Sequence, residues 1–370
     1  MKVIEIKNVG FDNKGAELML RTILQQLVDF KFVITPNERL VYHDFSHLRL
    51  SMRLDLPRNS FLTLEHICQF LPKKIRHRIG VVNFQEVDVI LDCSGLAYSD
   101  DWGVADAIKC LSLFKKAKKK NKKIIMLPQA FGPFENLRLK NIMKQIFTLA
   151  DKVYVRDQVS LTHCLSVVDR DYEVCPDFTN IYHKIDLEAE KNKNNVVTFV
   201  PNYRLVDKHG ISVNDMVKYA LIAKDMSSKN GLKFQVLINE EKDFELFNSA
   251  FSESGLNCYY SKNIEDLTRK LAESSFVISG RYHAAATALS CNVPTMCLAW
   301  SHKYLELLRI YGMEDYINDL DSFDNYKVQL QDLFSEFSER ARHDILAHKN
   351  SQYRSITDEF FKNLRELINE

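Results

Sequence analysis

The chain has 370 residues, too many for one ordinary domain, and its 46% hydrophobic and 11% aromatic residues can bury substantial cores. The chain has 50 basic and 49 acidic residues, and the resulting net charge of +1 argues against a nucleic-acid partner. Eight scattered cysteines without a C-x-x-C pair indicate reduced thiols and a cytoplasmic location. We expect neither a signal peptide nor a membrane-spanning helix, because Lys2, Glu5 and Lys7 interrupt the first ten residues and no uninterrupted apolar stretch reaches about 18 residues.

Strand-like runs alternate with helix-period runs through most of the chain, which predicts an α/β fold with parallel sheets. A less regular, basic stretch lies at residues 35–80. In the first half we expect strands at 2–9, 87–93, 123–127 and 152–155, and helices at 16–30, 104–120 and 137–150.

A polar, charged segment at residues 186–195 reads as a linker. After it we expect strands at 196–200, 233–238, 276–279 and 295–300, helices at 213–230, 244–254 and 264–274, and one long amphipathic helix at the end. The predicted domains are therefore a Rossmann-like domain at 1–185, a second one at 196–335 and a helical segment at 336–370. Two such domains should face a cleft, with ligands beyond the carboxyl ends of the strands.

The most informative segment is residues 276–304, where a buried strand is followed by Arg281, His283 and an Ala-rich helix. N–H groups at a helix start favour anions, and an arginine fork matches carboxylate or phosphate oxygens. The sequence therefore predicts an anion site at this corner. The structural alternative is that both side chains only cap the helix and bond to neighbouring carbonyl groups.

Other basic side chains follow neighbouring strands. Arg204 comes after the strand at 196–200, and we expect it to converge with Arg281. Together with His283 and Lys303, these arginines would form a compact site for a small, multiply charged anion. The Arg156–Asp157 pair at another strand end is more typical of a local ion pair.

Three loops of the first half carry further candidates, at residues 8–17, 92–103 and 127–134. The first loop lacks the glycine and lysine order of phosphate-binding loops. The second combines hydroxyl groups, carboxylates and Trp102, which suits the polar edges and apolar face of a sugar ring. Each loop has a structural alternative as a turn or a helix cap. The candidate residues there are Asn13, Lys14, Ser94, Asp101 and Gln129.

Two basic runs occur at residues 73–78 and 115–123. Such runs are usually solvated faces, but clusters of this size also rest on anionic lipid, so peripheral contact with the inner face of the cell membrane stays open. Metal-ligand spacing of the Cys/His kind is absent, with His43 and His47 beside Asp44 as the nearest approach. We expect no required metal.

Several motifs follow one another along the chain. They are Asn13-Lys14-Gly15-Ala16-Glu17, Ser94-Gly95 with Trp102-Gly103, the run from Leu127 to Pro133, Val155-Arg156-Asp157, Pro176-Asp177, and the run from Ser279 to His283 with Val293-Pro294 and Lys303. Taken in this order, they resemble the polysaccharide pyruvyl transferase family. The resemblance spans residues 3–315 and leaves out only the C-terminal helical region.

The resemblance implies an architecture like the glycosyltransferase B fold, with phosphoenolpyruvate as donor and a sugar of a glycan or lipid-linked precursor as acceptor. The product is a cyclic pyruvate ketal that bridges two hydroxyl groups, and no other cofactor is needed. Gly15-Ala16-Glu17 and Ser94-Gly95-Leu96 depart from the commoner family motifs. Galactose, mannose and N-acetylmannosamine therefore stay open as acceptors.

Arg281 and His283 match the family's Arg-x-His motif, which implies a donor-site role for both. We assign His283 to proton transfer or to the leaving phosphate, and Arg281 and Arg204 to the donor's anionic groups. Lys303 would add charge. Ser279 and Gly280 complete the expected donor site, and the expected acceptor residues are Asn13, Lys14, Ser94, Gly95, Asp101 and Gln129.

Two other functions compete with this interpretation. One is a glycosyltransferase of the same architecture that uses a nucleotide sugar. The other is a non-catalytic protein that binds a glycan.

Overall fold

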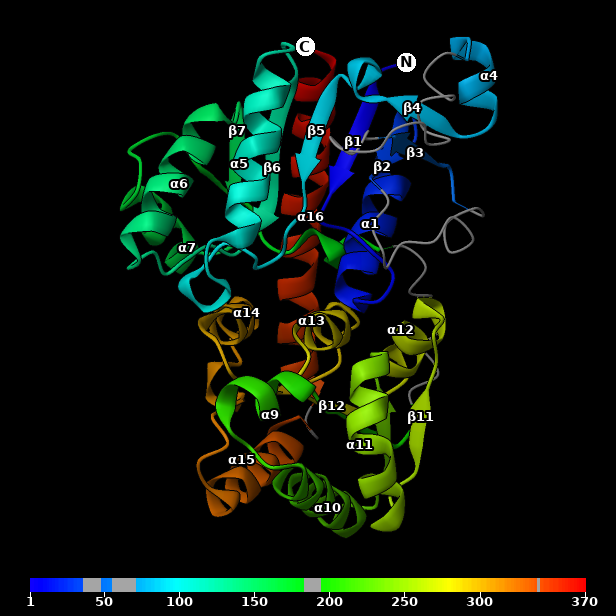
Figure 1. The fold of residues 1–370 in the computed structure, drawn as a ribbon. Helices are drawn as coiled ribbons and strands as arrows, with labels where there is room; N and C mark the ends of the chain where they lie inside the picture. The colour runs from blue at the N-terminus through cyan, green and yellow to red at the C-terminus, as the bar shows by residue number, and fades with distance from the viewer. Residues whose placement is uncertain (36–47, 55–70, 183–193, 338–339) are drawn as a thin grey trace. The chain divides into compact units, whose positions relative to one another are not determined.

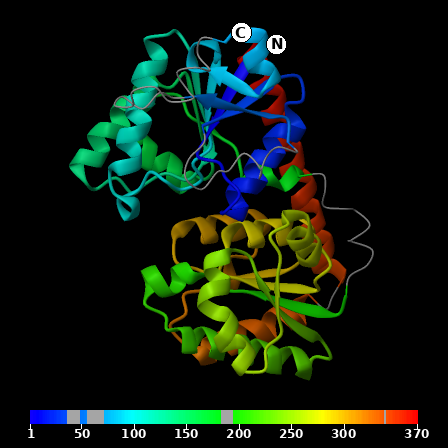
Figure 2. The same cartoon turned by 45° about the vertical axis from the view of Figure 1, so that its right-hand side comes forward.

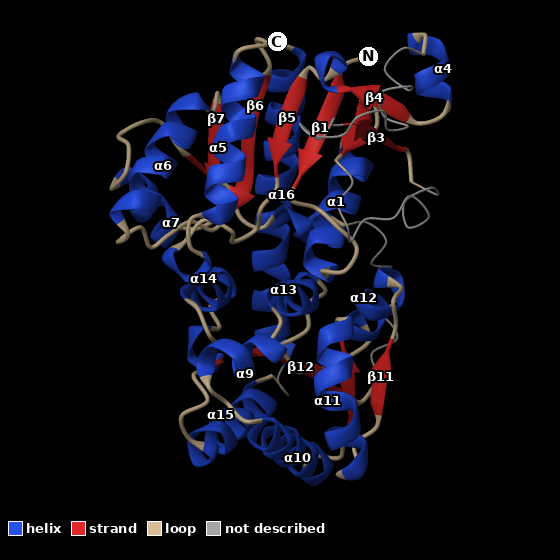
Figure 3. Cartoon of the chain, in the orientation of Figure 1, coloured by secondary structure: helices blue, strands red, loops and turns tan. Residues whose placement is uncertain are grey.

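The computed structural model describes residues 1–35, 48–54, 71–182, 194–337 and 340–370. The chain divides into two compact units, each built around a parallel sheet (Figures 1 and 3). Unit 1 comprises residues 1–11, 19–178 and 358–370, and unit 2 comprises residues 12–18 and 179–357.

Among the described residues, unit 1 holds an eight-stranded sheet in the order β4-β3-β2-β1-β5-β6-β7-β8. Neighbouring strands pair in parallel throughout, and most are apolar enough to be buried on both faces. The strands are β1 (Val3–Lys7), β2 (Lys31–Ile34), β3 (Leu50–Leu54), β4 (Val81–Asn83), β5 (Val89–Asp92), β6 (Lys123–Gln129), β7 (Lys152–Val155) and β8 (Glu173–Val174).

Helices that turn an apolar face toward this sheet cover it. They are α1 (Lys14–Gln26), α5 (Ala105–Lys118), α6 (Leu137–Leu149) and α7 (Gln158–Leu165). The short helix α4 (Lys73–Arg78) precedes β4 and buries Arg76 instead of an apolar side chain. The 3-10 turns are η1 (Phe84–Glu86), η2 (Asp100–Trp102) and η3 (Phe178–Ile181), and η3 lies at the boundary between the two units. The end of the long helix α16 (Arg340–Asn369) also belongs to unit 1. There the Phe360 ring meets Tyr154 with centroids 4.9 Å apart, and Phe361 meets Phe178 at 5.8 Å.

Unit 2 has a six-stranded parallel sheet in the order β11-β10-β9-β12-β13-β14 among its described residues. Two buried clusters line its two faces, and Figure 2 shows helices on both sides of this sheet. Its elements are β9 (Val196–Val200), α9 (Tyr203–His209), α10 (Val213–Lys229), β10 (Lys233–Ile238), α11 (Glu241–Glu253), β11 (Cys258–Tyr260), α12 (Ile264–Ala272), β12 (Phe276–Ser279), α13 (Tyr282–Ser290), β13 (Thr295–Leu298), α14 (His302–Tyr311), η4 (Glu314–Tyr316), β14 (Ile317–Asn318) and α15 (Phe323–Glu336).

The strand order reverses direction at one place in each sheet. In unit 1 the reversal lies between β1 and β5, and in unit 2 it lies between β9 and β12. The loops that leave two such strands diverge, and the space between them is where open parallel sheets hold their ligands. This rule directs attention to residues 8–10 and 93–95 in unit 1, and to residues 201–204 and 280–283 in unit 2.

The predicted α/β fold with two parallel sheets and a C-terminal helix is confirmed. Four predicted strands, at 152–155, 196–200, 233–238 and 276–279, have the bounds that the sequence indicated. Residues 186–193 of the expected linker lie outside the described residues, so the domain boundaries stay a prediction. The compact units are also discontinuous, since the first turn of α1 belongs to unit 2 and the end of α16 to unit 1.

Candidate active site

The turn between β12 and α13 is held rigidly by its own side chains and by α14. The Ser279 hydroxyl accepts a hydrogen bond from the Arg281 backbone N–H at 3.0 Å and donates one to the Arg281 carbonyl at 2.8 Å. The Gly280 carbonyl accepts from Asn202 Nδ2 at 2.6 Å and from the Tyr304 hydroxyl at 2.7 Å. Because Asn202 follows β9, its bond to Gly280 joins the two loops at the strand reversal of unit 2, and the Tyr304 bond joins the turn to α14.

Gly280 is required by the close approach of these loops. A Cβ atom at this position would lie 2.8 Å from Leu205 Cδ1 and 3.1 Å from Asn202 Cβ. Leu205 is fully buried, so it has little room to withdraw. The predicted donor residues Ser279 and Gly280 therefore shape the turn through their own contacts.

Arg281 is buried and paired with two carboxylates of the segment that begins α11. Its Nε and Nη2 atoms donate to Asp243 at 2.9 and 2.6 Å, and Nη1 lies 2.7 Å from Glu240 Oε2. Burial by itself opposes the charge, but Asp243 and Glu240 raise the pKa of Arg281 above its ordinary value. Burial also raises the pKa of Glu240, despite the nearby guanidinium. Three of the five N–H donors of Arg281 thus have carboxylate acceptors.

The ring of Tyr203 brings Arg204 and Arg281 into one neighbourhood, as the sequence predicted for these two side chains. The Arg204 guanidinium lies 4.6 Å from the ring centroid and that of Arg281 lies 5.2 Å from it. Arg204 is more exposed and forms an ion pair with Asp207 at 2.8 Å. Both guanidinium groups are therefore engaged by carboxylates as well as by the aromatic ring.

His283 lies in the first turn of α13 and packs against Gly15, the second residue of α1. A Cβ atom at Gly15 would be 2.0 Å from His283 Nδ1 and 2.6 Å from Cε1, so only glycine leaves room for the imidazole. The residues are 268 positions apart in the sequence (283 − 15) and belong to the same compact unit. The Tyr282 ring meets the imidazole edge to face, with centroids 5.2 Å apart.

Lys303 occupies the first turn of α14 among three aromatic rings. Its Nζ atom lies 4.5 Å from the Trp300 ring centroid, 5.4 Å from that of Tyr304 and 5.5 Å from that of Tyr282. The faces of aromatic rings attract a cation and fix its position. Since Tyr282 is the first residue of α13, Lys303 is held next to the start of that helix.

Lys14 and Asn13 stand at the start of α1. Lys14 is buried and donates to Glu17 Oε2 at 2.8 Å and to the Lys262 carbonyl at 2.7 Å. Asn13 is exposed, and its side chain accepts a hydrogen bond from the Ala16 backbone N–H at 2.9 Å, as a helix cap does. Both residues, which we expected beside the acceptor in the first domain, thus lie with His283 in unit 2.

The starts of three helices, α1, α13 and α14, adjoin one another in unit 2. Gly15 of α1 touches His283 of α13, and Lys303 of α14 approaches Tyr282 of α13. The N-terminus of a helix carries a partial positive charge and directs backbone N–H groups outward. This arrangement, with an imidazole and an ammonium group in it, is suited to an anionic ligand.

In unit 1, the loops at the strand reversal share a buried network around Asp92. Its Oδ1 atom accepts from Asn8 Nδ2 at 2.9 Å and from the Ser94 hydroxyl at 2.8 Å, and Oδ2 accepts from Gln129 Nε2 at 3.0 Å. Gln129 also accepts from the Ser94 backbone N–H at 3.1 Å. Burial raises the pKa of Asp92, although its hydrogen-bond donors act in the opposite direction.

This network shows how the predicted acceptor residues of unit 1 are placed. Gln129 is fully buried with both ends of its amide engaged, so it orients the Ser94–Gly95 turn. Gly95 has φ +66°, a conformation that suits glycine, and its carbonyl accepts from the Ala130 N–H at 2.8 Å. Asp101 is exposed in η2, whereas its neighbour Asp100 binds the backbone N–H of Glu135 at 2.7 Å.

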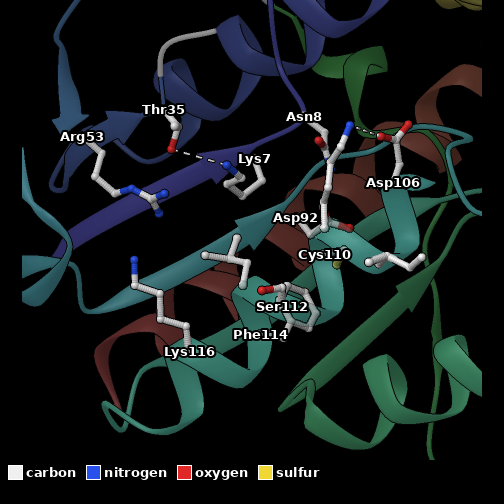
Figure 4. A pocket seen from close by; sticks show the side chains of 13 residues that line it. Lys7, Asn8, Thr35, Arg53, Asp92, Asp106, Cys110, Ser112, Phe114 and Lys116 are labelled. Carbon is white, nitrogen blue, oxygen red and sulfur yellow. Dashed lines mark hydrogen bonds and ion pairs between the residues drawn. The ribbon is translucent and has the colours of Figure 1, made fainter. Parts of the chain in front are cut away.

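A cavity of about 540 Å³ opens beside this network, between the strands and α5 (Figure 4). Lys7, Asn8 and Asp92 line it from the strand side. Arg53, which also faces it, forms an ion pair with the buried Glu5. Its wall on α5 is partly apolar, with Ile108, Leu113 and Phe114.

One sequence interpretation is corrected by the structure. Arg156 does not pair with its neighbour Asp157; its Nη1 atom lies 3.2 Å from Asp177 Oδ2, in the Pro176-Asp177 motif. Asp157 instead caps α7, accepting from the Ser160 N–H at 2.6 Å. The two motifs therefore hold β7 and the segment after β8 together.

The residues that position Arg281 and Gly280 were not predicted from the sequence. Asp243 and Glu240 hold Arg281, and Asn202 and Tyr304 hold Gly280. The polar run that follows β10 could have suggested Glu240, because it stands at the carboxyl end of a strand. In the described parts of the chain, no group of three or more His, Cys, Asp or Glu residues could hold a metal ion.

The comparisons with solved structures show the fold. The UDP-GlcNAc 2-epimerase of Neisseria meningitidis bound to UDP-GlcNAc is 10% identical with a TM-score of 0.57, covering 96% of this chain and 94% of the other. The MnaA–UDP structure from S. aureus is 14% identical with a TM-score of 0.57 and covers 100% and 97%. Anabaena HepE in complex with UDP-glucose is 11% identical with a TM-score of 0.56 and covers 100% and 98%. The chain thus has the glycosyltransferase B fold that we expected.

Among curated proteins, no sequence matches this chain. The model of one protein family, polysaccharide pyruvyl transferase, matches residues 13–302, which include the first turn of α1, the Ser94–Gly95 turn and the β12–α13 corner. The match covers most of the chain and includes Gly15 and His283. The protein is therefore a transferase that belongs to the polysaccharide pyruvyl transferase family.

Proposed function

We propose that this protein transfers pyruvate from phosphoenolpyruvate to two hydroxyl groups of a sugar and thereby forms a cyclic ketal. The sugar belongs to a surface polysaccharide or to its lipid-linked precursor. The observation that supports this best is the meeting of the first turns of α1, α13 and α14 around His283 and Lys303. Phosphoenolpyruvate is small and carries a carboxylate and a phosphate, which suits such a site.

The donor's anionic groups are bound by the backbone N–H groups at the start of α13 and by the Lys303 ammonium. Three of the five N–H groups of Arg281 bond to Asp243 and Glu240. Arg281 can therefore contact phosphoenolpyruvate only through the two N–H groups that remain. Its main contribution is to hold the turn from Ser279 to His283 in place. Arg204, whose guanidinium shares the Tyr203 ring with Arg281, adds charge at the same corner.

The reaction requires one proton to be added to the donor's methylene carbon, which makes the neighbouring carbon electrophilic. One sugar hydroxyl adds to that carbon and loses its proton, phosphate leaves, and the second hydroxyl closes the ketal and loses its proton. One of these protons balances the new methyl group and the other leaves with phosphate. His283 is the side chain that exchanges protons at this corner.

The acceptor is bound by the turn at Ser94 and Gly95, which the network around Asp92 and Gln129 positions. Asn13, Lys14 and Asp101 are further acceptor candidates. Ser94 and Gly95 are half-buried, and Gly95 has no side chain that would hinder the approach of a sugar. Galactose, mannose and N-acetylmannosamine are the acceptors to compare.

The experiment incubates the protein with phosphoenolpyruvate and a panel of glycans that end in these three sugars. We expect one acceptor to gain the mass of pyruvate less water, with one phosphate released for each ketal formed. A phosphate release without a change in any acceptor, or a complete absence of both, would contradict the proposal. The matched control is phosphoenolpyruvate with an acceptor whose two hydroxyls are blocked as methyl ethers.

A nucleotide-sugar glycosyltransferase is the second candidate, because the similar solved structures contain UDP, UDP-GlcNAc or UDP-glucose. A ligand that binds the folded state raises the melting temperature. We expect phosphoenolpyruvate to stabilise the protein and UDP-sugars to leave its Tm unchanged. Stabilisation by a UDP-sugar, with transfer of its sugar, would favour the second candidate instead.

We place this reaction in the cytoplasm. The described cysteines are all free thiols, which suits a reducing compartment. Within the described residues, no helix is both long enough and apolar enough to cross a membrane.

A further inference from the structure

Two basic segments of unit 1 meet around the turn η1, on the edge of the sheet where the strands begin. Residues 115–123 contain seven lysines and no acidic residue, and α4 adds Lys73, Lys74 and Arg78. α4 lies just before β4, and α5 ends just before β6, so both segments are at the starting edge of the sheet (Figure 1). The loops around Asp92 lie at the opposite edge.

Contacts to η1 fix both segments. Glu86 binds Arg76 of α4 at 2.9 Å and His77 at 3.1 Å. From the other side, Lys116 of α5 lies 4.6 Å from the Phe84 ring centroid and Lys122 lies 4.8 Å from it. The exposed side chains of the two segments therefore form one surface, which we call the basic edge. Its members are Lys73, Lys74, Ile75, Arg78, Ile79, Lys115, Lys116, Lys119 and Lys120.

The charges of the basic edge are largely uncompensated. Within the described part of the chain, no acidic side chain forms an ion pair with Lys74, Arg78, Lys115, Lys119 or Lys120; the nearby pairs are Lys73 with Glu86 and Lys118 with Asp151. The chain as a whole is nearly neutral, with 50 basic and 49 acidic residues. This local excess of positive charge is consequently a property of one surface.

The basic edge also contains two large apolar side chains. Ile75 is 47% exposed and Ile79 is 48% exposed, and they are four residues apart at the end of α4, on one helical face. Lysine and arginine attract an anionic surface, while apolar side chains enter the headgroup layer of a bilayer. A nucleic acid or an acidic protein would use the charges, but the isoleucines would gain nothing from a phosphate backbone.

We propose that the basic edge binds the surface of a membrane that contains anionic lipids, with Ile75 and Ile79 entering the headgroup layer. This inference goes beyond the proposed reaction and does not depend on the identity of the donor. It gives the protein a means to stay near glycans that are assembled on lipid carriers, and leaves the opposite edge of the sheet clear of the bilayer.

The test is flotation of the full chain with vesicles of phosphatidylcholine, with and without phosphatidylglycerol. We expect binding only where phosphatidylglycerol is present, and weaker binding as salt is raised. The variant that carries Lys74→Glu, Arg78→Glu, Lys119→Glu and Lys120→Glu should bind at least about tenfold more weakly, because each basic residue near the surface contributes about fivefold.

In a matched control variant, four exposed basic residues outside the basic edge are changed to Glu, so that its net charge equals that of the first variant. These residues are Arg138, Lys144, Lys233 and Lys362. This control should bind as the unchanged protein does. Equal losses in both variants, or no dependence on phosphatidylglycerol, would overturn the proposal. Circular dichroism and phosphate release with a water-soluble acceptor report whether each variant is folded.

A third variant, Ile75→Ser with Ile79→Ser, tests the membrane against other anionic partners. It should lose vesicle binding severalfold while keeping all charges of the basic edge. Unchanged vesicle binding in this variant would contradict the insertion of the two isoleucines. If the protein bound an oligonucleotide more tightly than the vesicles, and this variant bound the oligonucleotide equally well, the partner of the basic edge would be a nucleic acid.

Discussion

The contact between Gly15 and His283 is the most specific feature of the site at the scale of single residues. It joins the first turn of α1 to the first turn of α13, and a methyl group at Gly15 would overlap the imidazole. Glycine in a helix is about 1 kcal/mol less favourable than alanine. Its presence at this helical position is therefore explained by the imidazole that it admits.

A double-mutant cycle tests this contact. We expect His283→Ala to lower kcat by about a hundredfold or more, as the loss of a proton-transferring group does, with Tm nearly unchanged. Gly15→Ala should also lower kcat, because it displaces the imidazole. In the His283→Ala background the overlap is gone, so Gly15→Ala should have no further effect on kcat.

The control for this cycle is His348→Ala, an exposed histidine of α16 that bonds Gln352. Its turnover should equal that of the unchanged protein. Additive effects of Gly15→Ala and His283→Ala on kcat would show that the two residues act independently. That result would contradict the proposal that Gly15 affects kcat through the imidazole of His283.

Because the pKa of Asp92 is raised, the stability of the protein should depend on pH. The folded pKa lies above the unfolded value, so this carboxyl stabilises the folded state fully below the unfolded pKa of about 3.9, and its contribution is lost as pH rises through the folded pKa. The free energy of unfolding of the unchanged protein, minus that of Asp92→Asn, should accordingly fall as the pH rises above about 4.

Urea unfolding at a series of pH values measures this difference, and the exposed Asp101→Asn variant is the control. A difference that stays constant or increases with pH would show that burial does not dominate at Asp92. The result bears on the proposed acceptor site, because the same carboxyl accepts hydrogen bonds from Ser94 and Gln129.

At the scale of elements, the corner between β12 and α13 is held by α11 through Asp243. Removing one partner of a buried ion pair leaves an uncompensated charge. Asp243→Asn should therefore lower the free energy of unfolding by about 3–5 kcal/mol, because the guanidinium of Arg281 stays buried. Asp207→Asn, which removes the exposed partner of Arg204, should cost less than about 1 kcal/mol.

Thermal and urea unfolding of these two variants measure the effect. If Asp243→Asn were as stable as Asp207→Asn, the buried pair could not be what fixes the corner. A stable Asp243→Asn protein with raised KM for phosphoenolpyruvate would instead indicate that Asp243 acts mainly by orienting Arg281.

Elements were predictable from the sequence where apolar runs are bounded by polar turns. The strand at Phe276–Ser279 and the helix that follows it are examples, since four buried residues lead into an Ala-rich run. Strands β2, β3 and β4 were missed because they are short and lie within or beside a stretch that is basic and irregular. The helix at Tyr203–His209, which the Asn202 side chain caps, was not among the predicted elements.

The candidate site was predictable only in part, for a physical reason. A strand, a turn and a helix are local, so the sequence places Arg281 and His283 at a helix start. The partners of these residues come from distant segments: Asp243 precedes Arg281 by 38 positions, and Gly15 lies near the other end of the chain. Local patterns carry no information about which carboxylate or glycine the fold will bring to them.

At the scale of the whole molecule, both compact units follow one plan. Each has a parallel sheet whose strand order reverses once, and in each the two loops at the reversal are joined by hydrogen bonds, through Asn8 and Asp92 in unit 1 and through Asn202 and Gly280 in unit 2. Ser94 lies at the reversal in unit 1, and Arg281 and His283 lie at the reversal in unit 2. We therefore propose that the β12–α13 corner of unit 2 binds the donor and that the Ser94–Gly95 turn of unit 1 contacts the acceptor.

The position of phosphoenolpyruvate in a crystal soaked with it tests this assignment most directly. We predict that the donor lies within hydrogen-bonding distance of His283 and of the backbone N–H groups that begin α13, with its anionic groups near Lys303. Phosphoenolpyruvate bound instead in the cavity beside Lys7 and Arg53, or anywhere else away from the first turn of α13, would contradict the account.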